Sequence, residues 1–192
     1  MHTYIVKMGN SMKKYVVLVL AIVAVVVFFS GFFTFSSYAN QGNNTYNSNG
    51  ISFNYSSSWQ KIPNVKTQNA LAGIGDLKSA DESTGNVNTV VIVQKVALPS
   101  NMTLEQFYDD TYAKYAQDST YRAVSNKTIT VNGLAGYENV HKVIANGFLK
   151  EERVIWLEKN GNIYVILCGA LIGDFDSQQA NFDIVIKSFR IQ

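Results

Sequence analysis

The segment YRAVSNKTITVNGLAGYENVHKVIANGFLKEERVIWLEKNGNIYVILCGA, residues 121–170, decides the fold of this chain. It contains three Asn-Gly pairs, at 132–133, 146–147 and 160–161, and each lies between runs rich in β-branched and aromatic residues. Asn-Gly tolerates the positive φ angles that a two-residue type I′ hairpin turn requires. The segment therefore predicts four consecutive antiparallel strands, at about 122–131, 134–145, 148–158 and 162–170.

Further strands are expected upstream of this segment. In ISFNY, residues 51–55, the alternation of apolar and polar positions is typical of a strand with one buried face. VNTVVIVQKVAL, residues 87–98, is a nearly continuous β-branched run, as expected for a central strand buried on both faces. Residues 69–79 alternate more weakly, and we interpret them as a further strand.

Two amphipathic helices are expected to cover the sheet, because a sheet with an apolar face needs a second layer. The first begins with a capping box, in which Thr103 and Gln106 bind each other's backbone amides. Its apolar stripe has helical spacing and consists of Leu104, Phe107, Tyr108, Thr111 and Tyr115. The second helix is expected to be capped by Asp176 or Ser177 and to end near Phe189. The pattern predicts an α+β fold with a central antiparallel sheet.

The segment YVVLVLAIVAVVVFFSGFFTF, residues 15–35, is long and apolar enough to span a bilayer as one helix. Lys13 and Lys14 precede it, which places a leader, residues 1–14, in the cytoplasm and the rest of the chain outside. A signal peptide cleaved after Ala39 is the alternative, although the length of the apolar run favours an uncleaved anchor. We therefore expect a single-pass cell-membrane protein with an external C-terminal domain, or a secreted protein if cleavage occurs.

The rest of the chain divides into a tether and one domain. Residues 36–49, SSYANQGNNTYNSN, are polar and predict a flexible tether, and residues 50–192 are long enough for one globular domain with a real core. Three of the 16 Lys and Arg residues precede the apolar run, whereas all 14 Asp and Glu residues follow it. The domain is therefore nearly neutral, which argues against a nucleic-acid partner.

Cys168 is the only cysteine, so an intrachain disulfide cannot form. Its position among apolar strand residues predicts a buried and inert thiol. Four Asn-x-Ser/Thr sequons occur, although chance matches are expected in a chain so rich in Asn. The sequons are Asn43, Asn54, Asn101 and Asn126, of which Asn43 in the tether and Asn101 in a loop are expected to be accessible.

His141 is the only histidine after the apolar run and the first candidate for chemistry. Its predicted strand places it on one face with Tyr137 and Asn139, whereas Glu138 and Lys142 point to the opposite face. A metal site needs a second His or Cys nearby, and the sequence supplies none. We therefore expect an ordinary strand histidine that is half exposed to solvent.

The acidic pairs have structural explanations. Asp109 and Asp110 diverge by about 100° around their helix and are expected to be solvated. Asp174 and Asp176 lack the Gly and later Glu of a calcium loop, so helix capping explains them better. Glu151 and Glu152 alternate across a strand, which argues against a glycosidase pair. Gly-x-Ser-x-Gly and dinucleotide motifs are missing, and we predict no catalytic, cofactor-binding or metal-binding residue.

Three short motifs resemble PsbP-like and PsbP-related domains. They are GISFNY at 50–55 with Trp59, TLEQF at 103–107, and the closing segment from Phe182 to Ile191, which ends in SFRI. The chain departs from the family pattern at residues 56–58, where the usual Pro before Trp is missing. The resemblance implies an α/β/α sandwich over residues 50–191, with helices on both sides of the sheet. It transfers no binding residue, and the predicted membrane anchor argues against carrying over the photosynthetic role of PsbP itself.

These observations favour a membrane-tethered, non-catalytic binding or accessory module for an envelope protein complex. One alternative is a hydrolase centred on His141, with a carboxylate brought close by the fold. Another is a carrier for a small ligand, with a pocket between sheet and helix lined by Tyr108, Tyr112 and Trp156.

Overall fold

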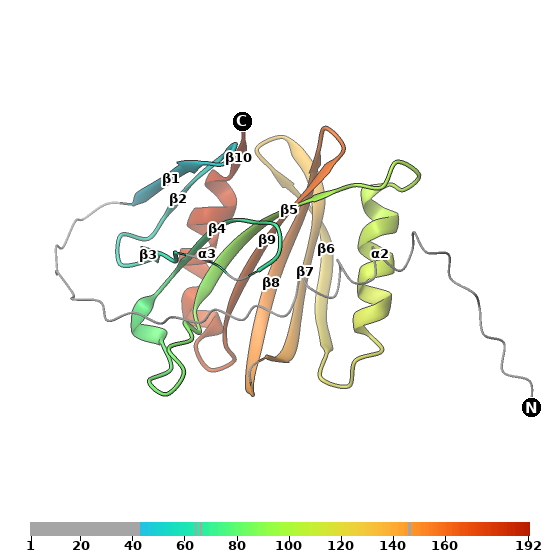
Figure 1. Ribbon diagram of the computed structural model, residues 1–192. Helices are drawn as coiled ribbons and strands as arrows, with labels where there is room; N and C mark the ends of the chain where they lie inside the picture. Colours follow the sequence, from blue (N-terminus) through green and yellow to red (C-terminus); the bar gives the residue numbers. More distant parts are fainter. Residues whose placement is uncertain (1–42, 64, 66, 146) are drawn as a thin grey trace, which may run out of the picture.

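The four-strand meander forms as the sequence predicts. The computed structural model describes residues 43–63, 65, 67–145 and 147–192, so the apolar run at 15–35 lies outside the described residues. The strands of the meander are β6 (Arg122–Val131), β7 (Leu134–Ala145), β8 (Phe148–Lys159) and β9 (Asn162–Leu171). In the first turn, φ is +48° at Asn132 and +84° at Gly133, the left-handed geometry for which Asn-Gly is suited. The meander is the large twisted ribbon in the middle of Figure 1.

Three upstream strands complete a seven-stranded sheet with the order β3-β4-β5-β9-β8-β7-β6. β5 (Val90–Ala97) pairs antiparallel with β9 and is buried on both faces over Val90–Gln94, which confirms the expected central strand. The weak strand predicted at 69–79 is shorter, because β4 (Ala70–Gly75) gives way to the 3₁₀ helix η1 (Leu77–Ser79). At the far edge, β3 (Gln60–Lys61) has only two residues.

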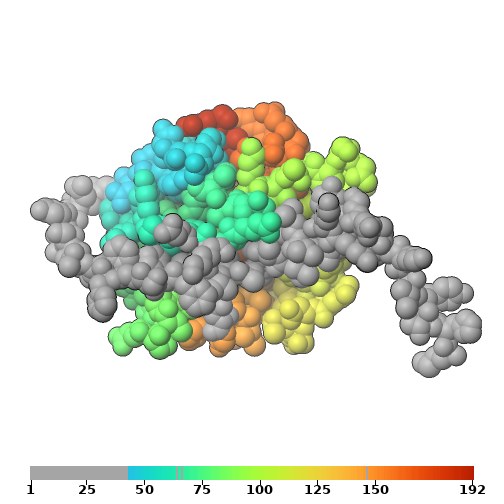
Figure 2. All heavy atoms as spheres, in the orientation of Figure 1, coloured from blue at the N-terminus to red at the C-terminus, as the bar shows by residue number. Residues whose placement is uncertain are grey.

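A second, three-stranded sheet has the order β1-β2-β10. Its strands are β1 (Asn44–Ser48), β2 (Ile51–Tyr55) and β10 (Arg190–Ile191). The tether predicted at 36–49 is therefore wrong for residues 44–48, because Tyr46 is buried and stacks on Phe53 with 4.9 Å between ring centroids. In Figure 2 the blue N-terminal strands lie beside the red C-terminal end, as the pairing of β10 with β2 requires.

The two helices lie on opposite faces of the large sheet. α2 (Leu104–Tyr115) begins with the predicted capping box, in which both Thr103 and Gln106 make their hydrogen bonds. α3 (Phe175–Ser188) has Asp174 at its N-cap position with no side-chain cap bond, so the prediction that Asp176 or Ser177 caps this helix is wrong. The mixed fold with an antiparallel sheet is thus confirmed (Figure 1).

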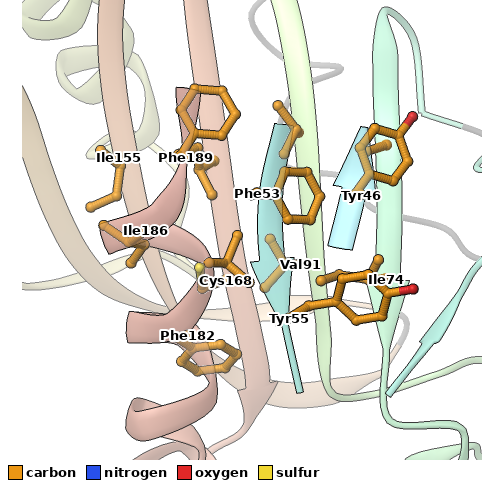
Figure 3. Close-up of a cluster of buried hydrophobic side chains, with 14 of the residues drawn as sticks. Tyr46, Phe53, Tyr55, Ile74, Val91, Ile155, Cys168, Phe182, Ile186 and Phe189 are labelled. Carbon is orange, nitrogen blue, oxygen red and sulfur yellow. The ribbon is translucent and has the colours of Figure 1, made fainter. Parts of the chain in front are cut away.

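Each helix encloses its own apolar cluster. The cluster under α3 also receives the small sheet and includes Phe53, Phe182 and Phe189 (Figure 3). Trp59 belongs to the same cluster. The cluster under α2 includes Phe107, Tyr108 and Trp156. Within the described ranges, no helix is both long and apolar enough to cross a membrane.

Candidate functional site

His141 lies on the α2 face of β7 and is fully buried, with 0% of its surface exposed. The expectation of a half-exposed histidine is therefore wrong, because α2 and the chain leading into β6 close over this part of the sheet. The rings of Tyr112 and Tyr121 lie 6.0 and 5.0 Å from the imidazole, centroid to centroid. Burial by these rings separates the imidazole from bulk solvent.

A carboxylate lies beside the imidazole. Nε2 of His141 is 3.2 Å from Oε2 of Glu152, but the two atoms are not hydrogen-bonded to each other. Nδ1 is 2.9 Å from Oδ1 of Asn139. His141 and Glu152 are direct partners across β7 and β8. The sequence analysis allowed for a carboxylate near His141 but did not identify Glu152, although counting outward from the turn at 146–147 would have placed the two residues opposite each other.

The surroundings of this pair disfavour extra charge. Glu152 is 2% exposed, and Lys150, on the same face of β8, is 6% exposed. Burial lowers the pKa of Lys150, and the nearby Glu152 only partly offsets this effect. Burial also raises the pKa of Tyr112 and Tyr115 well above the ordinary value for tyrosine. A histidine and a carboxylate are the parts of a general base, but here they are packed into the layer between helix and sheet.

The three proposed carrier residues do come together. The rings of Tyr108 and Tyr112 each lie 6.0 Å from that of Trp156, and the Trp156 Nε1–H donates to the Tyr112 hydroxyl over 3.1 Å. The three side chains pack against one another and fill the space between α2 and the sheet. The three residues therefore act as core aromatics that fasten α2 to the sheet.

Cys168 faces the other side of the sheet. It is fully buried in the cluster under α3, and burial raises the pKa of its thiol. The burial of this thiol expected from the sequence is confirmed, and the raised pKa disfavours the reactive thiolate form. Among the described residues, no group of three His, Cys, Asp or Glu side chains is arranged to hold a metal ion.

An ion network occupies the α3 face. Arg153 donates to Oε2 of Glu138 over 2.9 Å from Nε and lies 2.8 Å from Oδ1 of Asp183. Lys127 binds the other oxygen of Glu138 over 2.9 Å. Burial alone would lower the pKa of Arg153, but these bonds to Asp183 and Glu138 raise it above its usual range. The network links the meander to α3 and leaves Glu138 doubly paired.

An open groove of about 770 Å³ lies where α2 begins, at the end of the sheet opposite β3. Its wall is the start of α2, and its floor is formed by β6, β7 and β8. The lining includes Leu104, Glu105, Thr128, Thr130, Tyr137 and Glu158. Burial, then the charges of Glu105 and Asp109, raise the pKa of Tyr137. The groove thus combines an aromatic floor with negative charge.

The edge strand β6 borders this groove and is open to solvent. Every residue from Arg122 to Thr128 is exposed, whichever face of the sheet it points to. β6 ends the strand order, and its outer edge is unpaired within the described part of the chain. An unpaired edge presents backbone donors and acceptors to solvent.

The predicted surface residues are also accounted for. Asp109 and Asp110 are exposed on α2, as expected, and so are all four sequon asparagines. Asn54 and Asn126 lie within strands β2 and β6. Glu151 and Glu152 point to opposite faces of β8, with only Glu152 beside His141.

An antiparallel sheet with one helix on each face and a closed polar core defines an α+β sandwich. The PsbP-like protein family matches residues 16–191. The chain therefore belongs to the PsbP-like protein family, as its motifs suggest. A comparison with curated proteins found no match.

Several solved structures share the fold, among them the following two. Cyanobacterial PsbP (CyanoP) from Synechocystis sp. PCC 6803 is 14% identical with a TM-score of 0.56, over 82% of this chain and 98% of that one. LpqN, a protein involved in cell envelope biogenesis of Mycobacterium tuberculosis, is also 14% identical, with a TM-score of 0.54, over 80% of this chain and 92% of that one. At this identity the likeness establishes the fold.

Proposed function

We propose that this protein is a membrane-tethered, extracytoplasmic PsbP-like domain that binds another envelope protein and performs no chemistry of its own. The observation that carries the proposal is the open β6 edge, ten residues long, beside a groove of about 770 Å³. The groups fit for chemistry, His141, Glu152 and Cys168, are each at most 2% exposed. Recognition surfaces are exposed in this fold, whereas the reactive side chains are enclosed.

The proposed location rests on the sequence. Residues 15–35 have the length and polarity of a bilayer span, and Lys13 and Lys14 orient it. The family match begins at residue 16, so it includes nearly all of this apolar run together with the domain. The likeness to LpqN, a protein of cell envelope biogenesis, agrees with this placement.

Two measurements on the full chain test the proposal. For topology, two reporters are fused in turn to the C-terminus of the chain. Alkaline phosphatase should be active there, and a fluorescent protein that matures only in the cytoplasm should not fluoresce. For binding, a photo-crosslinking residue is placed at Ser125 on β6 and, as a matched control, at Ala180 on α3, both of which are exposed. We expect a discrete adduct from Ser125 alone. Inverted fusion signals, or the same adducts from both positions, would refute the proposal.

One observation favours a second candidate, a hydrolase. His141 and Glu152 lie 3.2 Å apart, and a carboxylate beside an imidazole is the usual partnership of a general base. Catalysis would require α2 to move and admit substrate. Turnover of any ester, amide or glycoside by the purified protein, abolished by His141→Gln, would favour this candidate over the binding module.

A further inference from the structure

We infer that β6 and the adjoining groove together receive an extended segment of a partner protein, added as an eighth strand, with a Lys or Arg side chain directed into the groove toward the carboxylates of Glu105 and Glu158. This inference rests on the proposed function and specifies the chemistry of the partner. It concerns a surface distinct from the buried His141 pair. Three features of the described residues carry it.

The first feature is the unguarded outer edge of β6. Proteins blunt such edges with short strands, prolines, bulges or charges. The opposite edge, β3, is only two residues long. β6 has a register shift between Ala123 and Ser125, but from Ser125 to Val131 its pairing with β7 is regular and its sequence contains no proline. Lys127, the one charge in this stretch, is engaged by Glu138 on the α3 face.

The second feature is the continuity of edge and groove. Thr128 pairs with Tyr137, and Thr130 pairs with Ala135, so these four side chains share the α2 face and form the floor of the groove. A strand added outside β6 lies about 10 Å from β7, two strand spacings of ~4.8 Å. Alternate side chains of that strand would point over Thr128 and Thr130. Only a long side chain reaches across them to Tyr137.

The third feature is charge. Glu105, in the first turn of α2, and Glu158, on β8, both line the groove. Within the described residues neither forms an ion pair, whereas every acidic residue of the α3-face network is paired. Carboxylates without a cation, beside an aromatic ring, favour a ligand that brings a positive charge. Glu158 accepts a hydrogen bond from the Gly161 amide, but a neutral or acidic side chain at this position would leave both carboxylates without a cation.

Peptide binding to the full chain in detergent micelles tests the inference. The probe is a fluorescent octapeptide of alternating Thr and Val with a central Lys. Three control peptides are compared with it. Two carry norleucine or Glu in place of the central Lys, and the third keeps Lys but has N-methylated backbone amides. We expect the Lys peptide to bind best and the N-methylated one not to bind, because strand addition needs backbone donors.

The matched protein variants separate charge from surface. The double variant Glu105→Gln, Glu158→Gln should lower the affinity for the Lys peptide about three- to tenfold and leave the affinity for the norleucine peptide unchanged. The control double variant Glu82→Gln, Asp110→Asn removes two exposed carboxylates outside the groove. It should leave the affinities for both peptides unchanged. Equal binding of the N-methylated peptide, equal effects of the two double variants, or self-association of the chain through β6 would overturn the inference. If Ser125 still gives its specific crosslink, only this inference fails, and the proposed function stands.

Discussion

The two faces of the seven-stranded sheet are covered in different ways. On one face, α3 and the small sheet pack phenylalanine and tryptophan rings, with Phe182 in contact with Trp59 at 5.9 Å between centroids. On the other face, α2 packs tyrosines around an imidazole and a carboxylate, His141 and Glu152. The α3 face is mostly apolar, and its charged side chains Arg153, Glu138 and Asp183 pair in one network. The α2 face holds polar groups inside the layer itself.

This difference follows from dimensions. A seven-stranded sheet is about 29 Å wide at ~4.8 Å per strand spacing, whereas a helix with its side chains is only about 10–12 Å across. On the α3 face the small sheet extends the cover, since β2 packs beside α3. On the α2 face one helix leaves the end near β6 open, where the groove lies. The α3 face is therefore covered more completely, and the α2 face leaves a groove open to solvent beside β6.

The largest expected effect is on the α3 face. Phe182→Ala empties a site that is 0% exposed and is enclosed by Trp59 and Phe175. We expect it to lower the free energy of unfolding by about 4–5 kcal/mol, the upper part of the range for a buried Phe→Ala substitution. Phe107→Ala removes the same ring on the α2 face and should cost less, about 3 kcal/mol, because the helix end beside the groove can relax. Urea unfolding followed by tryptophan fluorescence measures both, and equal losses would contradict the contrast between the faces.

Arg153→Met should have the next largest effect. The substitution leaves Glu138, whose side chain is 5% exposed, with Lys127 as its remaining ionic partner. We expect a loss of about 3 kcal/mol, the low end for breaking a buried pair, because Arg153 is 15% exposed. Adding Glu138→Leu should recover part of the loss, since no buried unpaired charge then remains and Lys127, whose side chain is 62% exposed, stays in solvent. A double variant less stable than Arg153→Met would show that the network itself is not the cause.

The meander was predictable because its signals are local. Asn-Gly turns and β-branched runs gave β6 and β7 with their observed ends, and β8 and β9 to within one residue. β1 was missed, although Asn49-Gly50 before β2 is the same turn signal, with φ of +54° and +73°. The polar sequence of β1 concealed it, because only Tyr46 in this strand is buried.

The candidate site was less predictable because it depends on distant contacts. The burial of His141 requires α2 and Tyr121 to fold back over β7, which no local pattern in the sequence specifies. The pairing of His141 with Glu152 was available from hairpin register alone. The groove needs the start of α2 to lie over β6, β7 and β8, a tertiary arrangement that periodicity does not determine.

A smaller effect is expected from a single hydroxyl on the α2 face. Tyr112→Phe removes the acceptor of the Trp156 indole N–H, which is buried. An unsatisfied buried donor costs about 1–3 kcal/mol, and we expect about 1–2 kcal/mol in urea unfolding. Tyr108→Phe is the matched control, because its hydroxyl makes only a long 3.4 Å contact with Asn139. If both variants lost the same stability, the indole hydrogen bond would not be what fastens α2.

The smallest effect should separate the two faces by pH. Burial alone would raise the pKa of Asp183, but hydrogen bonds from Lys187 and Arg153 lower it below the usual value. The contribution of Asp183 to the free energy of unfolding is therefore complete above its pKa in the unfolded chain, ~3.9. It is lost as pH falls through the lower pKa in the folded protein. Burial raises the pKa of Tyr112, so its contribution is complete below about pH 10 and is lost as pH rises further.

Asp183 is a third exposed, so its share should stay under about 1 kcal/mol. Asp183→Asn should flatten the acid limb of a plot of unfolding free energy against pH and leave the alkaline limb unchanged. An altered alkaline limb would mean that the two faces do not respond independently.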